Sequence, residues 1–590
     1  LDWPKAEHST SKMLQPQDRY FDWMDYSVFG AMLIFSALIG VYFAFFAKNK
    51  QVSSSEYLMG GRTMGIFPIS MSLIASYISG ISLLGIPAEM YVYGTQYWLI
   101  VASDCMVSLT MAFVYLPVFF KLKITSSYEY LNMRFNKAVC ILGSGIFVLK
   151  MMLYIPMVIY VPALAFNQVT GVNLHLITPL VCVVCIFYTT VGGLKAVVWT
   201  DTLQTILMLA GVVVVLVMGT VRVGGPAVVW ERNDFSGRLE FLNLDFDVTT
   251  RHTVWNIVIG NYFYWLAACS VNQAMVQRCL AMPTIRQANY TVLILAVGIM
   301  ALVSMCCYTG LVLFAYFHTC DPISTKMISK SDQLLPYFVM EIAGSVPGFP
   351  GVFMSGVFSA ALSTMSTGLN SMCGVIFTDF VRPCLREPVS ELRSSWIMKG
   401  IVLTIGVLCV AMVFFVEKLG AIIQAGKSLA GITTGTLLGM FSLGMFFPWA
   451  NAEGALVGSV VSLALLAWLS VGTQTAVARG QITFPQKPIF TYGCPEEVLN
   501  RTLTFVHAAP NAGEPLAVFR LSYMWYTLVG TSTTILVGMA VSWWTGFTDP
   551  ATVHRDLLTP VIHRFLPPTP TPAPTTQNNA EMELKKIHKS

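Results

Sequence analysis

The segment from Gly351 to Phe380 is long enough to cross a membrane, and hydroxyl side chains occupy its middle. The hydroxyls belong to Ser359, Ser363, Thr364, Ser366 and Thr367. Their spacing places them on adjacent faces of one helix. Such hydroxyls supply neutral oxygen ligands to a small hard cation that must shed water. They also bond to their own backbone and let helices pack closely. This segment alone leaves both interpretations open.

Two further apolar segments contain residues that weaken a membrane helix. Residues 65–93 carry serines every two to four positions, followed by Gly80, Gly85 and Pro87. Residues 254–277 are the second polar, aromatic-rich segment, and they include Gly260, Asn261, Tyr262, Trp265, Ser270, Asn272 and Gln273. A helix interrupted at mid-membrane frees backbone carbonyls that bind ions or substrates. Ordinary glycines in packed helices are the alternative for each segment.

Three ionisable residues lie deep inside apolar segments: Asp104, Lys150 and Lys427. Each would cost several kcal/mol if it faced lipid, so we expect each to face a partner or substrate inside the bundle. For Lys150, snorkelling or a structural pair is the alternative. Asp201 begins the apolar segment 201–222, where a helix cap is the alternative to a role at an ion site.

The composition indicates an integral membrane protein. The chain has 590 residues, of which 55% are hydrophobic and only 11% are charged, whereas soluble proteins are about a quarter charged. We count about thirteen segments of membrane length. They cover residues 26–47, 65–93, 97–120, 138–166, 174–192, 201–222, 254–277, 289–317, 350–380, 396–416, 419–447, 453–472 and 521–545. The spacing of the two interrupted segments predicts two five-helix repeats, at about 65–222 and 254–447, with one helix before and two after.

The polar segments predict how the chain is oriented in the membrane. Basic residues, Arg278 and Arg286 among them, gather in short loops that we expect to be cytoplasmic. Residues 1–25 are then an extracellular segment without a cleavable signal peptide. The membrane domain covers 26–545, and the Pro- and Lys-rich residues 546–590 form a disordered cytoplasmic tail.

Cysteines and sequons add predictions about the outer loops. Only Cys320 and Cys494 fall in loops expected outside, where a disulfide between them can form. The sequon at Asn500 lies in an outer loop and is the expected glycosylation site, whereas the sequon at Asn289 lies at an inner helix start. The sequence contains no Walker A loop and none of the protease, hydrolase or Cys/His metal motifs, so we expect neither an enzyme nor an ATP-driven pump.

Several motifs in the same order resemble the sodium/solute symporter family, particularly its branch of multivitamin, monocarboxylate and iodide carriers. The resemblance runs from about Asp25 to Gly546 and looks closest to the multivitamin carriers. Its motifs are Met24-Asp25-Tyr26, Gly85-Ile86-Pro87-Ala88-Glu89, Thr125-Ser126-Ser127-Tyr128-Glu129-Tyr130-Leu131, the run from Tyr188 to Asp201, Val271-Asn272-Gln273-Ala274, Val276-Gln277-Arg278, Leu362-Ser363-Thr364, Thr378-Asp379 and Arg382-Pro383.

The resemblance implies an all-α polytopic fold built as a five-plus-five inverted repeat of the leucine-transporter type. It also implies a sodium site made by backbone carbonyls and hydroxyls, with Asp201 behind it holding a ligand hydroxyl. The implied sodium ligands are the carbonyls of Ala75, Ile78 and Ala360 and the hydroxyls of Ser363 and Thr364.

The implied substrate site departs from the family pattern. By position it is formed by Ser82, Asp104, Tyr154, Trp265, Cys269 and Lys427. Tyr154 and Trp265 match the iodide carrier, whereas Ser82 and Asp104 replace its glutamines, Cys269 a tyrosine and Lys427 a phenylalanine. Iodide therefore does not fit. Whether Lys427 receives a substrate carboxylate or pairs with Asp104 stays open, as does any second sodium site.

We therefore expect a multi-pass plasma-membrane symporter that imports a small organic anion with Na⁺ by alternating access. Monocarboxylates and vitamin carboxylates such as biotin or pantothenate lead by resemblance. A neutral sugar, polyol or choline-like solute is the alternative substrate. A non-transporting sensor or a sodium-leak channel on the same scaffold is the alternative class. No nucleic acid and no obligate protein partner is expected.

Overall fold

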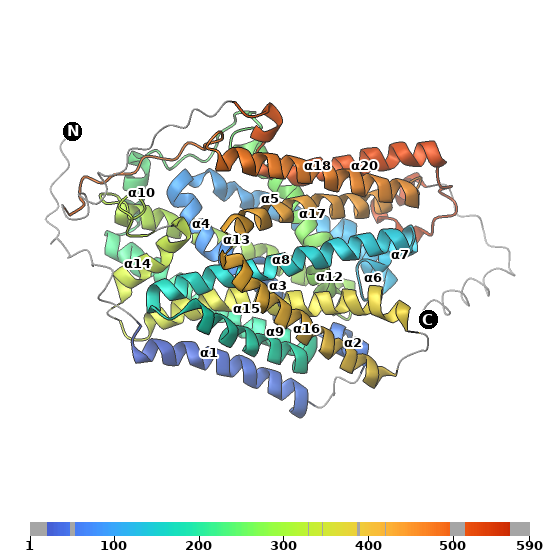
Figure 1. The fold of residues 1–590 in the computed structure, drawn as a ribbon, viewed down its shortest axis with the longest axis horizontal. Coiled ribbons are helices and arrows are strands. Elements are labelled where there is room, and N and C mark those ends of the chain that lie inside the picture. The colour runs from blue at the N-terminus through green and yellow to red at the C-terminus, as the bar shows by residue number, and fades with distance from the viewer. Residues whose placement is uncertain are drawn as a thin grey trace.

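The computed structural model describes residues 21–47, 53–328, 330–344, 346–385, 390–418, 420–495 and 514–566. The side chains of residues 415–430 lie outside this description. Within the described residues the regular elements are helices, and most run along the long axis of the molecule (Figure 1). The fold class is therefore all-α, as the sequence predicts.

The helices of the first half of the chain are α1 (Trp23–Val41), α2 (Ser54–Met59), α3 (Ile66–Tyr77), α4 (Gly80–Tyr93), α5 (Ile100–Thr110), α6 (Leu116–Leu122), α7 (Glu129–Arg134), α8 (Lys137–Thr170), α9 (Leu174–Val223) and α10 (Pro226–Phe235). The second half contains α11 (Tyr262–Leu266), α12 (Gln273–Leu280), α13 (Ile285–Phe317), α14 (Leu334–Ala343), α15 (Phe349–Val375), α16 (Glu391–Lys418), α17 (Gly420–Phe446), α18 (Ala452–Ala478) and α20 (Tyr526–Thr545).

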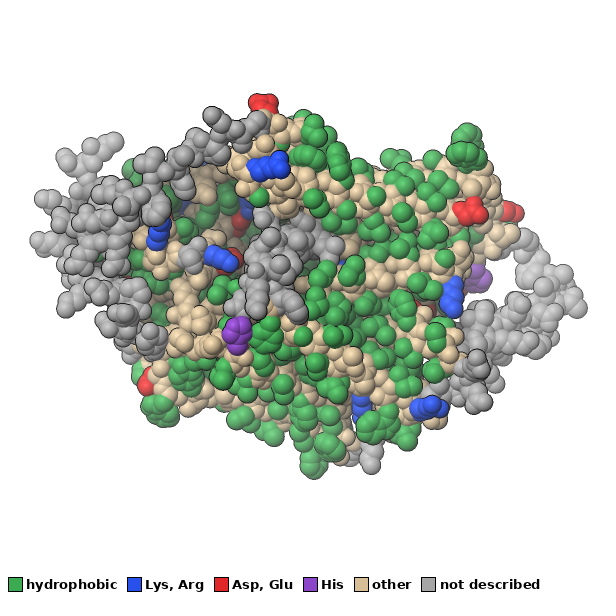
Figure 2. Space-filling model, in the orientation of Figure 1, with side chains coloured by type: hydrophobic (Ala, Val, Ile, Leu, Met, Phe, Trp, Pro, Cys, Tyr) green, Lys and Arg blue, Asp and Glu red, His purple; other side chains and the backbone are tan. Residues whose placement is uncertain are grey.

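Nine helices within the described residues are long and apolar enough to cross a membrane, or up to ten with the bent pair 54–77. The predicted count of thirteen and the inverted repeat remain predictions. Hydrophobic side chains cover the middle of the visible face, and charged ones lie mainly toward its two ends (Figure 2). This distribution suits a protein surrounded by lipid.

The hydroxyl-bearing helix lies at the centre of the molecule. The apolar stretch that qualifies residues 349–384 as a membrane span is 94% buried. No other membrane-length helix in the described residues is buried to this extent. Helix α15 packs on α9, α8, α1 and α3 (Figure 1). Its hydroxyls therefore face protein rather than lipid, where they can serve a polar site.

The described part of the tail is ordered, which corrects the prediction of disorder from residue 546. Leu558 is 1% exposed, and the Thr559 hydroxyl donates to the Val114 carbonyl at 3.0 Å. The Tyr130 hydroxyl donates to the Leu557 carbonyl at 3.0 Å. Burial of the apolar Leu558 side chain helps to hold this segment against the bundle. Residues 567–590 lie outside the described residues.

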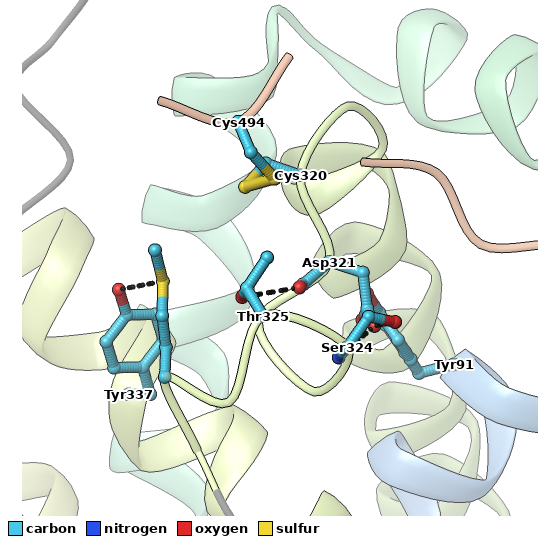
Figure 3. Close-up of a disulfide and its surroundings, with 8 residues drawn as sticks. Tyr91, Cys320, Asp321, Ser324, Thr325, Tyr337 and Cys494 are labelled. Atoms are coloured by element: carbon cyan, nitrogen blue, oxygen red, sulfur yellow. Dashed lines mark hydrogen bonds between the residues drawn. A yellow bond between two sulfur atoms is a disulfide. The ribbon is translucent and has the colours of Figure 1, made fainter. Parts of the chain in front are cut away.

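A disulfide joins Cys320 and Cys494, whose Cα atoms are 4.9 Å apart (Figure 3). Backbone hydrogen bonds flank it, from Gly493 N to Thr319 O at 3.0 Å and from Asp321 N to Phe490 O at 3.0 Å. The Tyr91 hydroxyl of α4 donates to Asp321 Oδ1 at 2.6 Å. Residues 319–321 and 490–494 therefore meet on one end of the bundle, which we call the disulfide face.

A partly buried ion cluster lies between the loop before residue 256 and α4. Arg251 donates to both carboxylate oxygens of Glu89, at 2.8 and 3.1 Å, and its guanidinium lies 4.3 Å from the Tyr93 ring centroid. His252 Nε2 is 3.4 Å from Glu89 Oε1, and the Tyr97 ring is 5.4 Å from the imidazole. Burial lowers the pKa of His252 to about 4, with Glu89 opposing the shift and Arg251 adding to it.

This burial predicts acid sensitivity. Above pH 6.5, the ordinary pKa of histidine, His252 is neutral in both the folded and the unfolded states. As the pH falls toward 4, only the unfolded state takes up the proton, so stability is lost, on the order of 3 kcal/mol. Thermal unfolding of the purified protein between pH 7.5 and 4.5 measures this loss.

The matched pair for this experiment is His252→Gln and His554→Gln, because the side chain of His554 is 60% exposed. The first variant should have a flatter dependence of melting temperature on pH than the wild type, and the second should keep the wild-type slope. Equal slopes in all three proteins would show that His252 does not carry the acid sensitivity.

Candidate functional site

The first predicted helix break lies between α3 and α4. Ile78 and Ser79 have extended backbone, with ψ of 104° and 164°. Gly80 follows, and a Cβ there would lie 2.7 Å from Pro162 Cγ and 3.2 Å from the Val357 carbonyl oxygen of α15. Only glycine lets the broken segment approach α15 this closely. The break deprives carbonyls of the last turn of α3 of their intrahelical donors.

The hydroxyls of α15 meet α3 next to this break. The Ser76 hydroxyl lies 3.4 Å from the Ser363 hydroxyl and 3.0 Å from that of Thr367. Thr364 donates to the carbonyl of Ala360 at 2.9 Å, and its oxygen keeps acceptor capacity. The structure thus brings the α3 end, which contains Ala75 and Ile78, against the turn of α15 that contains the other three predicted sodium ligands.

Asp201 lies behind this contact and is not a helix cap. The long helix α9 contains one non-helical residue, Gly193, with φ 49°. Asp201 comes two turns after that kink and is 0% exposed. The Ser72 hydroxyl of α3 donates to Asp201 Oδ2 at 2.6 Å. The capping alternative is therefore wrong. The carboxylate holds the Ser72 hydroxyl of the broken helix, and the hydroxyl of Ser363, a predicted sodium ligand, also lies within hydrogen-bonding reach of it.

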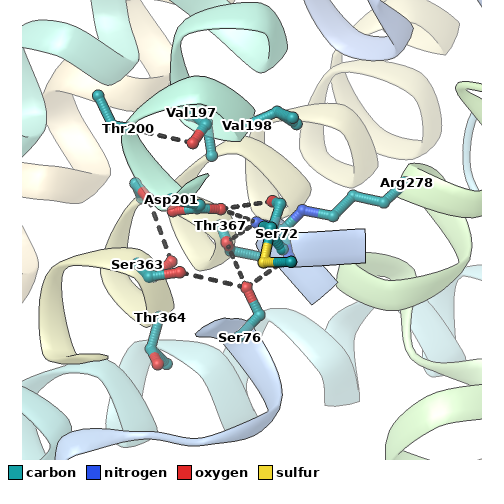
Figure 4. A network of polar contacts seen from close by, with 12 residues as sticks. Ser72, Ser76, Val197, Val198, Thr200, Asp201, Arg278, Ser363, Thr364 and Thr367 are labelled. Carbon is teal, nitrogen blue, oxygen red and sulfur yellow. Dashed lines mark hydrogen bonds and ion pairs between the residues drawn. The ribbon is translucent and has the colours of Figure 1, made fainter. Parts of the chain in front are cut away.

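Arg278 also belongs to this network, although its position in the sequence predicts a loop. The second break, at Asn272 with ψ 125°, begins α12, and this helix carries Arg278 into the bundle. The guanidinium is 1% exposed and donates from Nη2 to Asp201 Oδ2 at 2.6 Å (Figure 4). The apolar run Cys279-Leu280-Ala281-Met282 that follows Arg278 was the available signal, because it shows that the buried segment continues past the charge.

Three of the predicted substrate residues gather around Tyr77, at the end of α3. The Trp265 ring of α11 stacks on Tyr77 with centroids 3.9 Å apart, and Asp104 and Cys269 lie next to the Tyr77 hydroxyl. Asp104 Oδ1 accepts a long bond of 3.5 Å from Asn261, whereas Oδ2 has no hydrogen-bond partner among the described residues. An acceptor oxygen is thus available beside an aromatic wall.

The remaining predicted substrate residues divide into two groups. Ser82 and Tyr154 lie at the break itself, where the hydroxyls of Ser82 and Ser79 are 3.2 Å apart and Tyr154 is next to Ser79. Lys427 falls on α17, but its side chain lies outside the described residues, as does the whole of Asn500. Lys150, the third deep charge, donates to the Thr434 hydroxyl at 3.2 Å.

A membrane bundle with two interrupted helices around a central polar site is the architecture of a secondary transporter. A family model described as the sodium:solute symporter family matches residues 57–462, so the chain belongs to this family. It is therefore a sodium-coupled symporter with Na⁺ as the coupling ion, and not an enzyme.

Curated relatives support the same assignment. Sodium-coupled monocarboxylate transporter 2 of Mus musculus is 38% identical over 92% of this chain and 87% of its own length. Sodium-coupled monocarboxylate transporter 1 of Homo sapiens is 39% identical over 88% and 87%. The sodium-dependent multivitamin transporter of Oryctolagus cuniculus is 37% identical over 92% and 86%. Because these identities are so similar, they do not distinguish monocarboxylates from vitamins as the substrate class.

A solved structure of a Na⁺-coupled sialic acid symporter, in a substrate-bound outward-open state, shares the fold. Its TM-score is 0.72 and its identity 22%, and the match covers 90% of this chain and all of the other. At this identity the likeness shows the shared architecture but gives no information about the substrate of this chain.

Proposed function

We propose that the protein imports a small organic anion with sodium, and that sodium binds between the broken helix and α15. The observation that carries this proposal is the contact of the α3 end with Ser363, where freed carbonyls and hydroxyls offer only neutral oxygens. Sodium bound there would link α3 to α15 and complete the adjacent substrate pocket, so that rocking of the repeats around it couples the sodium gradient to uptake. The ligands would be the oxygens of Ala75, Ile78, Ala360, Ser363 and Thr364.

The proposed substrates are monocarboxylates or vitamin carboxylates such as biotin or pantothenate. The names of the curated relatives support this class. Asp104 favours the alternative, a neutral hydroxylated solute, because a buried carboxylate with an open acceptor oxygen repels an anion and accepts a hydroxyl. The substrate would lie among Ser82, Asp104, Tyr154, Trp265, Cys269 and Lys427.

Voltage-clamp recording in oocytes tests the proposed function. A panel of carboxylates, sugars, polyols and halides is applied with sodium and again with sodium replaced by N-methylglucamine. We expect carboxylates to evoke a sodium-dependent inward current or, for an electroneutral cycle, sodium-dependent uptake of label. Responses to sugars or polyols alone would instead establish the neutral-solute carrier. A sodium leak that no solute changes would establish the channel.

We propose that Lys427 pairs with Asp104 when no substrate is bound, and that the substrate carboxylate replaces Asp104 as its partner. Lys427→Ile should then weaken carboxylate affinity, and adding Asp104→Gln should restore part of it, because the double variant leaves no buried charge alone. Half-saturating concentrations of the three proteins measure this. An unchanged affinity in Lys427→Ile would show that this lysine does not bind substrate.

We also propose that the disulfide face is extracellular, because a disulfide persists in an oxidising compartment. Asn500 would then carry a glycan, the N-terminus would be extracellular and the C-terminus cytoplasmic in the plasma membrane. A mobility shift on glycosidase treatment that Asn500→Gln abolishes would support this orientation, and its absence would contradict the predicted glycan.

A further inference from the structure

Lys150 is a charged side chain in the middle of the membrane helix α8, and its ammonium has one polar partner among the described residues. It donates to the Thr434 hydroxyl of α17 at 3.2 Å. Thr434 is 2% exposed, so the ammonium points into the bundle rather than toward a membrane surface. No carboxylate of the described residues forms an ion pair with Lys150. The described contacts therefore support neither snorkelling nor a structural ion pair.

Lys150 shares a face of α8 with Tyr154, one of the predicted substrate residues. The two residues are four positions apart in one helix, so their side chains are neighbours on its surface. Tyr154 is next to Ser79 at the helix break and next to Tyr264 of α11. Tyr264 is in turn next to Cys269. Lys150 therefore lies one helical turn from the side chains that form the predicted substrate pocket.

The positive charge of Lys150 favours an anion as its ligand. An ammonium inside a membrane bundle is stable when an opposite charge compensates it. Thr434 supplies a neutral oxygen and occupies one of the three N–H donors, so two donors remain for a ligand. Asp104, the buried carboxylate of the pocket, accepts from Asn261 and does not pair with Lys150. Because Asp104 repels an organic anion and Lys150 attracts it, the carboxylate of the anion should lie on the α8 side of the pocket.

We propose that Lys150 binds the carboxylate of the transported anion, with Thr434 holding the ammonium in place. The inference rests on the proposed function and deepens it, because it makes Lys150 a residue that selects anions over neutral solutes. A carboxylic acid should be preferred to its own amide, since only the ionised acid brings a counter-charge. The exchange proposed for Lys427 is a separate claim, because the two lysines lie on different helices and each can be replaced alone.

Uptake of radiolabelled biotin and pyruvate by oocytes, measured with sodium present and normalised to surface protein, tests the proposal. For whichever of the two acids the wild type takes up, Lys150→Gln should raise the half-saturating concentration about tenfold or more, because it removes a hydrogen bond to a charged group. The matched control is Lys399→Gln in α16. The ammonium of Lys399 lies 5.3 Å from the Trp396 ring centroid and forms no ion pair among the described residues. This variant should equal the wild type.

Restoring the charge chemically separates binding from packing. Lys150→Cys should lose affinity as Lys150→Gln does. Treatment with 2-aminoethyl methanethiosulfonate attaches an ammonium to the new thiol and should recover most of the affinity, whereas methyl methanethiosulfonate adds no charge and should not. Wild-type protein treated with each reagent controls for the native cysteines. Equal effects of the two reagents on Lys150→Cys would show that position 150 fills space without binding the carboxylate, and would overturn the proposal.

The outcomes distinguish this inference from the proposed function. A wild type that takes up neither acid, nor any other carboxylate, with sodium contradicts the proposed function and this inference with it. Sodium-dependent uptake by the wild type with an unchanged half-saturating concentration in Lys150→Gln overturns the inference alone. Replacing chloride by methanesulfonate tests whether an inorganic anion occupies the site instead. A chloride dependence that Lys150→Gln removes, with unchanged carboxylate affinity, would also overturn the inference.

Discussion

Transport by the double variant Ser363→Ala, Thr364→Ala is expected to lose its sodium dependence, while the protein still reaches the surface. Each substitution removes one hydroxyl oxygen from the proposed site, and water cannot readily replace either in a closed helix contact. Both residues are buried, and the Thr364 hydroxyl donates to a carbonyl of its own helix, so the helix itself should tolerate the change. Uptake measured against sodium concentration, normalised to surface protein, gives the result.

The matched control for this variant removes two other hydroxyls from α15. Ser355 and Ser371 are equally buried, and each donates to a carbonyl of its own helix, at 2.7 and 3.0 Å. Ser355→Ala with Ser371→Ala should keep the wild-type sodium response. If the variant at positions 363 and 364 kept it too, sodium would bind elsewhere.

Asp201→Asn should both destabilise the protein and raise the sodium concentration needed for half-maximal transport. The substitution leaves the Arg278 guanidinium buried without its counter-charge, which costs about 3–5 kcal/mol. It also removes a negative charge close to the proposed sodium ligands, and this weakens cation binding. Melting temperature and the sodium dependence of uptake measure the two effects.

Two comparisons make this prediction specific. Adding Arg278→Gln to Asp201→Asn should recover much of the lost stability, because neither charge then stands alone. Asp556→Asn breaks the exposed pair with Lys121, whose side chains are 55% and 42% exposed, and should cost no more than about 1 kcal/mol. A melting temperature of Asp201→Asn equal to the wild type would show that Arg278 finds its compensation elsewhere.

The breaks and the central helix could be predicted because they follow from local sequence. Serine and glycine at 79 and 80, and asparagine at 272, weaken a helix wherever they stand, and five hydroxyls in the middle of α15 mark it as a helix that packs inside the bundle. The family relationship followed from motifs that are themselves contiguous stretches of sequence.

Arg278 and Tyr77 were missed because their roles depend on partners distant in the sequence. Arg278 was assigned to a loop by the usual rule for basic residues near membrane ends, yet its partner Asp201 lies 77 residues away. Tyr77 is an ordinary apolar-face residue until Trp265 stacks on it. The tail prediction failed for the same reason, because Leu557 and Thr559 form hydrogen bonds with residues more than four hundred positions earlier.

The disulfide has a consequence for how the molecule is made. Its cysteines are separated by 174 residues, and the intervening chain contains α15, α16, α17 and α18. With the disulfide face outside, as proposed, Cys320 would wait as a free thiol in the lumen of the secretory pathway until these helices are inserted and Cys494 has been translocated. Chains that stall or terminate within this interval expose an unpaired cysteine, which thiol-based retention can recognise. The bond thus marks chains whose synthesis has passed the central helix and its hydroxyls.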